Sequence, residues 1–147
     1  MLIAIASDHG GFRTKGEVAR LLTSMGHTCH DLGPHERDSV DYPDYAQRVA
    51  TAVADGLYDS GILIRGTGQG MAMSANKVKG IRAAVCQDTY SAKMSREHND
   101  ANVLCMGERV LGPGLAEEIV KAWLEAEFSE EERHSRRVAK IRALEDR

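Results

Sequence analysis

The chain has 147 residues, of which 42% are hydrophobic and 28% are charged, and its formal net charge at pH 7 is −3. This length and composition predict one globular domain over residues 1–147. The weak negative charge argues against the broad basic surface that binds nucleic acid or an anionic membrane. No apolar run approaches the ~20 residues needed to cross a bilayer.

The first residues and the cysteines indicate where the protein works. Segment 1–7 is apolar but short, lacks a basic region in front and is followed by a charged residue, which predicts a buried strand rather than a signal peptide. Cys29, Cys86 and Cys105 lie far apart and include no Cys-x-x-Cys pair. We therefore expect a cytoplasmic protein with neither a disulfide framework nor a metal site.

Short apolar runs alternate with amphipathic segments along the whole chain. The apolar runs predict five strands, at 2–6, 27–32, 60–64, 81–86 and 103–106. The amphipathic segments predict helices at 14–25, 43–54, 71–79, 88–99, 113–127 and 130–147. In the first helix, for example, apolar residues recur at i, i+3, i+4 and i+7: Val18, Leu21, Leu22 and Met25.

This alternation is typical of an α/β protein with a parallel sheet. We expect a Rossmann-like three-layer αβα sandwich with five parallel strands and an extra C-terminal helix. The last helix, at about 130–147, is highly charged with few apolar residues, so we expect it to pack lightly on its own domain or on a neighbouring subunit. The common strand order for such a sheet is 2-1-3-4-5.

Two loops carry most of the candidate chemistry. In open parallel sheets, ligands bind outside the carboxyl ends of the strands, where the strand order reverses. That point lies between the first and third strands, which are followed by Asp8–Gly11 and Arg65–Gly70. The topology therefore predicts that these two loops lie side by side.

The second of these loops is rich in glycine, with Gly66, Gly68 and Gly70 at alternate positions. Such spacing lets backbone N–H groups approach a phosphate, a carboxylate or a developing oxyanion. The loop matches neither the Walker pattern nor the dinucleotide fingerprint. A tight strand–helix turn without a ligand is the alternative interpretation.

Polar residues elsewhere in the chain add weaker candidates. Asp8 and His9 end the first strand, where they could bind sugar hydroxyls or a phosphate or move a proton. His98 suits general acid chemistry, and Asn99 could hold a hydroxyl or an oxyanion. Helix capping is the alternative interpretation of both pairs, and for His98 and Asn99 taken alone it is the preferred one.

Two arginines in the last helix are a further candidate. Arg133 and Arg137 lie four residues apart, so on a helix they share a face, and paired guanidinium groups bind phosphate well. A solvated charged helix explains the same pattern. The remaining histidines are expected at the surface and not at a metal: His27, His30 and His35.

Several motifs together resemble the type B ribose-5-phosphate isomerases, which share their fold with the subunits of galactose-6-phosphate isomerase. The matching segments occur in the family's order and cover nearly the whole chain. They are 7–11, 41–43, 66–70, 74–77, 80–83, 90–92, 96–99, 107–110 and 133–134.

The resemblance implies a reversible aldose–ketose isomerisation of a small phosphosugar through an enediolate, without metal or organic cofactor. It implies that His98 opens the furanose ring by protonating the ring oxygen. It also implies that backbone N–H groups of one loop hold the enediolate and nearby hydroxyls: Gly66, Thr67, Gly68, Gln69 and Gly70. Thr67 would assist proton movement at the hydroxyls.

The same resemblance implies further contacts and an oligomer. It assigns sugar hydroxyls to Asp8, Tyr42 and Asn99. It assigns the phosphate to His9, Arg109, Arg133 and Arg137. In this family each active site is shared between two subunits, which implies a homodimer or a dimer of dimers.

The residues on either side of the glycine loop depart from the family pattern. One branch of the family has a cysteine directly before the loop that removes the C2 proton, and another uses a glutamate directly after it. This chain has Arg65 and Met71 at those positions. Arginine stays protonated at working pH and cannot replace a thiolate.

Three explanations follow from this departure. Asp8 could act as the base, because the topology places it nearest. Alternatively, Arg65 could bind an extra carboxylate or phosphate of a different substrate. The third explanation is a phosphosugar-binding or partner subunit with weak or no activity, since losing a general base typically costs about 10²–10⁴-fold in rate. A response-regulator-like domain is less favoured, because Asp8 is the single acidic residue at the end of the first strand.

Overall fold

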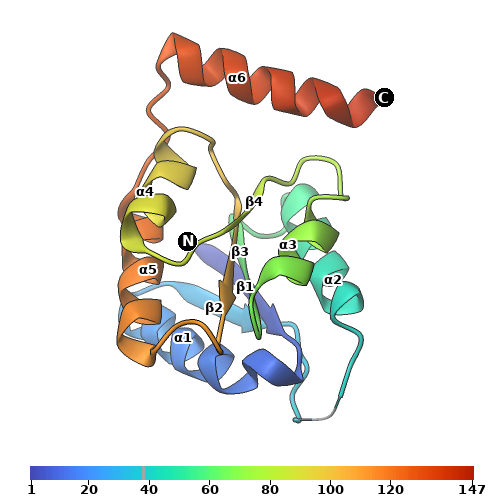
Figure 1. Ribbon diagram of the computed structural model, residues 1–147, viewed down its shortest axis with the longest axis vertical. Helices are drawn as coiled ribbons and strands as arrows, with labels where there is room; N and C mark the ends of the chain where they lie inside the picture. Colours follow the sequence, from blue (N-terminus) through green and yellow to red (C-terminus); the bar gives the residue numbers. More distant parts are fainter. Residues whose placement is uncertain (38) are drawn as a thin grey trace.

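The computed structural model describes residues 1–37 and 39–147. Its centre is a five-stranded parallel sheet in the order β2-β1-β3-β5-β4 (Figure 1). The strands are β1 (Leu2–Ser7), β2 (Thr28–Asp31), β3 (Ser60–Arg65), β4 (Ala83–Val85) and β5 (Val103–Gly107). The expected α/β fold with a five-stranded parallel sheet is confirmed.

Helices cover both faces of the sheet. One face packs against α1 (Phe12–Ser24), α4 (Thr89–Glu97) and α5 (Pro113–Glu125), and the other against α2 (Tyr42–Ala54) and α3 (Gln69–Ala75). Alternate residues of a strand point to opposite faces. Ile3 and Ile5 therefore join the first apolar layer, while Ala4 and Ala6 join the second.

The order of the two outer strands differs from the expected 2-1-3-4-5. All five residues of β5 are buried and this strand pairs with β3, whereas β4 is half-buried at the edge. The pairing of β1 with β3 is as expected. The change therefore leaves the reversal point between those two strands in place.

The edge strand and the helix before it are both shorter than predicted. Asn76 follows α3, and its side-chain amide donates to the carbonyl of Ala83 at 3.0 Å while accepting from the Ala83 N–H at 2.8 Å. These two bonds satisfy the backbone at the start of β4 in place of a neighbouring strand. The segment between α3 and β4 consequently runs as turns.

The C-terminal helix α6 (Glu132–Ala143) lies apart from the αβα layers, at the end of the molecule opposite the carboxyl ends of the strands (Figure 1). Its buried residues are His134 and Val138, whereas Ile141 and Leu144 are 41% and 62% exposed. The expected C-terminal helix is confirmed, and whether a neighbouring subunit covers it stays a prediction. Among the described residues, no helix is long and apolar enough to span a membrane.

Candidate active site

The loops that follow β1 and β3 lie against each other, as the topology predicts. A Cβ atom placed on Gly10 would meet the nitrogen of Gly66 at 3.4 Å, and one on Gly11 would meet the carbonyl oxygen of Ile64 at 2.5 Å. The N–H of Asp8 donates to the same carbonyl at 3.3 Å. Main-chain contact therefore fixes the relative position of the two loops.

Close approach by two neighbouring elements shapes the glycine loop. Gly68 has a φ of +82° and directly precedes α3. A Cβ on Gly107, at the end of β5, would meet the Cα of Thr67 at 2.6 Å. A Cβ on Gly70 would meet the ring of Tyr42 at 2.6 Å. Glycine is the residue that fits each of these positions without strain.

The loop presents backbone donors at this edge of the sheet. Among residues 1–37 and 39–147, the N–H groups of Gly66, Thr67 and Gly68 donate to no protein oxygen. The Thr67 hydroxyl accepts from the N–H of Gln69 at 3.3 Å, and both side chains are exposed. Such clustered N–H groups are suited to holding an anionic oxygen.

Asp8, Arg65 and Tyr42 form a cluster beside this loop. Asp8 is 2% exposed. Its carboxylate accepts from the Gly10 N–H at 2.8 Å and from Nε of Arg65 at 2.9 Å. The guanidinium of Arg65 also stacks on the Tyr42 ring, 4.1 Å from its centroid. Arg65 is thus held between a buried carboxylate and an aromatic face.

Exposed basic groups surround this cluster. His9 lies in a short 3₁₀ turn, η1 (His9–Gly11), and its side chain is exposed. Arg109 is exposed too, and its N–H donates to the carbonyl of Gly66 at 3.0 Å. We call the residues of these two loops, with Tyr42 and Arg109, the strand-end half-site.

The cysteines do not supply a base here. Burial raises the pKa of Cys29 and of Cys86 to about 11 each, with the neighbouring carboxylates of Asp31 and Asp88 adding to the rise. Burial also raises the pKa of Cys105. All three are therefore thiols near neutral pH.

The remaining predicted residues lie elsewhere, where α4 ends and α6 begins. His98 directly follows α4, and its ring stacks on that of His134 with centroids 4.2 Å apart and planes tilted by 31°. Asn99 is exposed. Arg133 and Arg137 are exposed on α6, where Nε of Arg133 donates to Glu131 at 3.0 Å. We call these residues the helical half-site.

Burial lowers the pKa of His134 in this cluster. The positive charges of protonated His98 and of Arg133 and Arg137 lower this pKa further, against the opposing charge of Glu131. A neutral His134 is consequently favoured beside His98.

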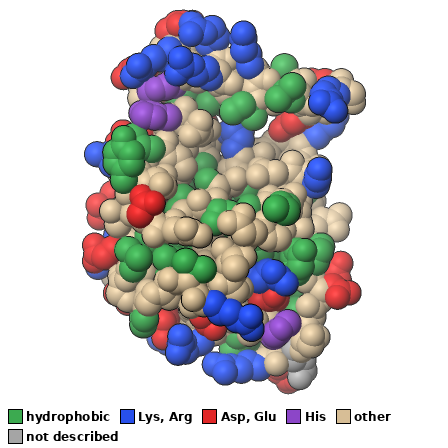
Figure 2. Space-filling model, in the orientation of Figure 1, with side chains coloured by type: hydrophobic (Ala, Val, Ile, Leu, Met, Phe, Trp, Pro, Cys, Tyr) green, Lys and Arg blue, Asp and Glu red, His purple; other side chains and the backbone are tan. Residues whose placement is uncertain are grey.

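The structure does not bring the two half-sites together within one protomer. The strand-end half-site lies at the carboxyl ends of β1 and β3, whereas α6 crosses the opposite end of the molecule (Figure 1). Basic side chains and histidines gather at both of these ends (Figure 2).

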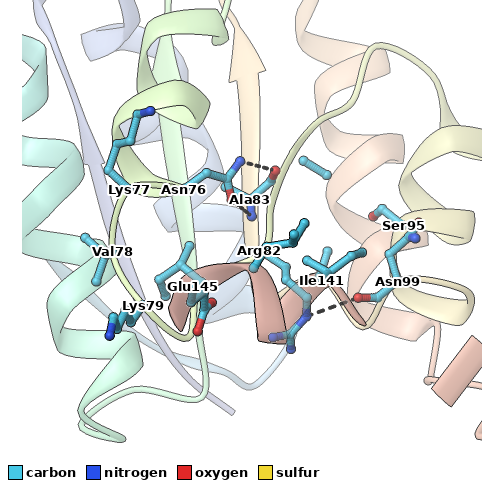
Figure 3. A pocket seen from close by; sticks show the side chains of 14 residues that line it. Asn76, Lys77, Val78, Lys79, Arg82, Ala83, Ser95, Asn99, Ile141 and Glu145 are labelled. Carbon is cyan, nitrogen blue, oxygen red and sulfur yellow. Dashed lines mark hydrogen bonds between the residues drawn. The ribbon is translucent and has the colours of Figure 1, made fainter. Parts of the chain in front are cut away.

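A groove of 590 Å³ runs between α6 and the segment that joins α3 to β4 (Figure 3). It includes Asn99, Arg82 and Ile141 but no residue of the glycine loop. This groove beside α6 is therefore separate from the strand-end half-site.

Sequence reasoning missed three contacts in these half-sites: the ion pair of Asp8 with Arg65, the stacking of Arg65 on Tyr42 and the stacking of His134 on His98. It placed Asp8 and Arg65 at one edge without predicting their ion pair or the stacking of Arg65 on Tyr42. It named His134 only as part of a motif, and the signal that could have singled it out is its place between Arg133 and Arg137, one helical turn before the apolar Val138.

Comparisons with known proteins identify the family of the chain. A model of the Ribose/Galactose Isomerase family matches residues 3–141. Ribose-5-phosphate isomerase B of Escherichia coli is 50% identical over 145 residues, covering 99% of this chain and 97% of that protein. The solved structure of ribose-5-phosphate isomerase B from Clostridium thermocellum has 54% identity and a TM-score of 0.97, covering 99% of this chain and 98% of that one.

A further structure, ribose-5-phosphate isomerase B of Mycoplasma genitalium, contains bound ribulose-5-phosphate. It is 41% identical with a TM-score of 0.95, covering 99% of this chain and 96% of that one. The chain therefore belongs to the ribose/galactose isomerase family of sugar-phosphate isomerases.

Proposed function

We propose that this protein interconverts ribose 5-phosphate and ribulose 5-phosphate through a cis-enediolate. The observation that carries the proposal is the set of N–H groups on Gly66, Thr67 and Gly68, which lack protein acceptors among the described residues beside a buried carboxylate. The reaction moves one proton from C2 to C1 and another between the two oxygens, so no atom is gained or lost. Its main demand is a site for the oxyanion that forms between these steps.

The proposed roles divide between the two half-sites. At the strand ends, the loop from Gly66 to Gly70 holds the enediolate, and the Thr67 hydroxyl relays protons between sugar oxygens. His98 protonates the ring oxygen to open the furanose. Three residues bind sugar hydroxyls: Asp8, Tyr42 and Asn99. Four bind the phosphate: His9, Arg109, Arg133 and Arg137.

We further propose that a second copy of the chain completes each site. One protomer places its two half-sites at opposite ends, so α6 does not reach the glycine loop of its own chain (Figure 1). In a symmetric dimer, the helical half-site of one protomer can face the strand-end half-site of its partner. A homodimer or a dimer of dimers satisfies this arrangement.

Neither of the two residues that flank the glycine loop can act as the base that removes the C2 proton. Arg65 remains a cation, and Met71 is fully buried in the core between α2, α3 and the sheet. Asp8 is the carboxylate in contact with Arg65, so it is the proposed base. In the proposed isomerase, the remaining N–H groups of Arg65 point toward the oxyanion or another anionic group of the substrate.

A second candidate function rests on the same ion pair. Both carboxylate oxygens of Asp8 already accept hydrogen bonds, from Gly10 and from Arg65, so both are engaged within the protein before a sugar binds. The chain would then be a phosphosugar-binding or partner subunit with weak or no activity. Its glycine loop and its arginines would still hold the ligand.

A coupled assay of the purified protein with phosphosugars of four to six carbons separates these functions, with Arg65→Cys assayed beside it. The isomerase proposal expects turnover of ribose 5-phosphate by the unmodified protein and a thermal shift with the same sugar. Turnover by Arg65→Cys alone supports the binding subunit. Absence of both turnover and binding for every phosphosugar contradicts both functions.

A further inference from the structure

His134 is a buried histidine to which the proposed reaction assigns no role. It is 4% exposed, whereas Arg133 and Arg137 on the same helix are exposed. Its ring lies against the face of His98, with centroids 4.2 Å apart and planes tilted by 31°. Histidine is fully buried less often than the apolar residues are. The burial of His134 against His98, the proposed ring-opening acid, therefore needs an explanation.

Ser129 connects this histidine pair to the backbone of α4. Its hydroxyl oxygen and Nδ1 of His134 are joined by a hydrogen bond of 2.6 Å. Its N–H donates to the carbonyl of Glu97, the residue before His98, at 3.0 Å. The N–H of His98 in turn donates to the carbonyl of Met94 at 2.9 Å. The backbone of His98 is therefore held by α4, and one face of its ring is held by His134.

We propose that His134 is a positioning residue that holds the His98 imidazole in the orientation needed to protonate the furanose ring oxygen. The inference rests on the proposed isomerase function. A general acid must come within about 2.6–3.2 Å of the atom it protonates. Since an error of about 1 Å can cost about 10²-fold in rate, a residue that limits the rotation of the ring has a direct effect on that step.

The position of His134 on α6 adds a second consequence. It follows Arg133 directly and precedes Arg137 by three residues, so the proposed phosphate contacts and the support for His98 share one helix. A phosphate bound to α6 therefore also helps to place the His98 imidazole against the sugar ring. The neutral state favoured for His134 keeps a second positive charge away from His98, which must carry the proton it donates.

Four variants of the full-length protein test this role. His134→Ala removes the stacked ring, and His134→Phe keeps an aromatic ring there without the hydrogen bond to Ser129. Ser129→Ala removes that hydrogen bond alone. Val138→Ala is the matched control. Val138 is also buried on α6, so its truncation loosens the packing of the helix, but Val138 is not stacked on His98.

The first measurement is the NMR spectrum of the His98 ring protons, which needs no turnover. A stacked ring shifts these protons through its ring current. We expect the signals to move downfield in His134→Ala and to stay near their original positions in His134→Phe and Val138→Ala. Unmoved signals in His134→Ala would overturn the proposal, whether or not the protein is an active isomerase.

The second measurement compares kcat for two aldoses, because ribose 5-phosphate is a closed furanose, whereas erythrose 4-phosphate carries its phosphate on O4 and cannot close that ring. For His134→Ala we expect kcat to fall about 10-fold with ribose 5-phosphate and less than about 3-fold with erythrose 4-phosphate, with KM nearly unchanged. His134→Phe should recover most of the loss. Equal losses with both aldoses, matched by Val138→Ala, would show a merely structural role and overturn the proposal.

If the protein turns over neither sugar, the isomerase function is contradicted but the stacking of His134 on His98 is not. The NMR comparison alone then tests the stacking. Ser129→Ala completes the series. Because the stacked ring remains, we expect a smaller change in both measurements than in His134→Ala. A larger change would assign the positioning to Ser129 and overturn the role of His134.

Discussion

The two half-sites of this chain are built in opposite ways. The strand-end half-site consists of loops locked together by main-chain contact, with Gly11 against the Ile64 carbonyl and Gly107 against Thr67. The helical half-site consists of side chains on the end of α4 and along a helix that buries only His134 and Val138. The folding of the sheet fixes the strand-end half-site, whereas the packing of α6 fixes the helical half-site.

This difference predicts which substitutions change both stability and activity and which change activity alone. An added Cβ at Gly11 or Gly107 has to displace backbone, so it changes stability and activity together. A truncated side chain on the exposed surface of α6 leaves the fold intact and changes ligand contacts alone. Variants in the two regions should therefore separate into two classes when stability and activity are measured side by side.

Gly107→Ala should have the largest effect. Its Cβ would lie 2.6 Å from the Cα of Thr67 and 2.7 Å from the carbonyl of Gly66, so the glycine loop must shift. We expect the free energy of unfolding to fall by about 1–3 kcal/mol and kcat/KM to fall about 100-fold. Urea unfolding and the coupled assay measure the two effects. Gly114→Ala is the control, because its Cβ meets nothing within 4 Å; equal behaviour of the two variants would refute the locked loop.

Arg137→Ala should reduce affinity without reducing stability. Its side chain is exposed on α6, and a hydrogen bond to a charged group is worth about 1.5–3 kcal/mol. We expect KM for ribose 5-phosphate to rise about 10- to 100-fold, with an unchanged midpoint of thermal unfolding. Arg136→Ala serves as the control, since Arg136 pairs with Glu132 at 2.7 Å on the same helix. An equal rise in KM for both variants would mean that α6 acts through its general charge.

Most of the fold followed from residue patterns, because each strand and helix is specified by its own periodicity. The order of the outer strands did not follow. The runs 81–86 and 103–106 are similarly apolar, and nothing local states which of them pairs with β3. Asn76 shortens β4 by bonding to Ala83, and this contact is visible only after the chain has folded.

The candidate site was predictable to the same extent. The neighbouring positions of the two loops depend only on β1 lying beside β3, which the alternation of elements predicts. The ion pair between Asp8 and Arg65 joins residues far apart in sequence, as does the stacking of His98 on His134. Such contacts depend on side-chain rotamers and not on periodicity, so patterns alone do not reveal them.

Arg65→Met should have an intermediate effect that sharpens the comparison. It leaves the carboxylate of Asp8, which is 3% exposed, without its charged partner. We expect the free energy of unfolding to fall by about 1–2 kcal/mol. Arg48→Met is the matched control, because Arg48 also stacks on a tyrosine, Tyr45, at 4.8 Å but is exposed. A loss no greater than in the control would mean that the Asp8 pair contributes little to the strand-end half-site.

The pH dependence of stability should show the smallest effect. Because the folded pKa of His134 is lowered, the unfolded chain binds more protons between that pKa and the usual value near 6.5. Stability contributed by His134 is therefore lost as pH falls through this window and is constant above it. We expect urea midpoints to depend less on pH between 5 and 7 in His134→Phe than in the unmodified protein. The control, His35→Phe at an exposed site, should keep the original dependence; an unchanged slope in His134→Phe would contradict the lowered pKa.

Complementation between the two half-sites tests the central claim most directly. Asp8→Asn disables the strand-end half-site and His98→Asn the helical one, and each variant alone should have little activity. When the two are refolded together, half of the dimers are mixed, and each mixed dimer holds one intact site. A site shared between subunits predicts recovery of about one quarter of the unmodified activity. Mixed dimers that are demonstrated by native mass spectrometry but remain inactive would contradict a site shared between subunits.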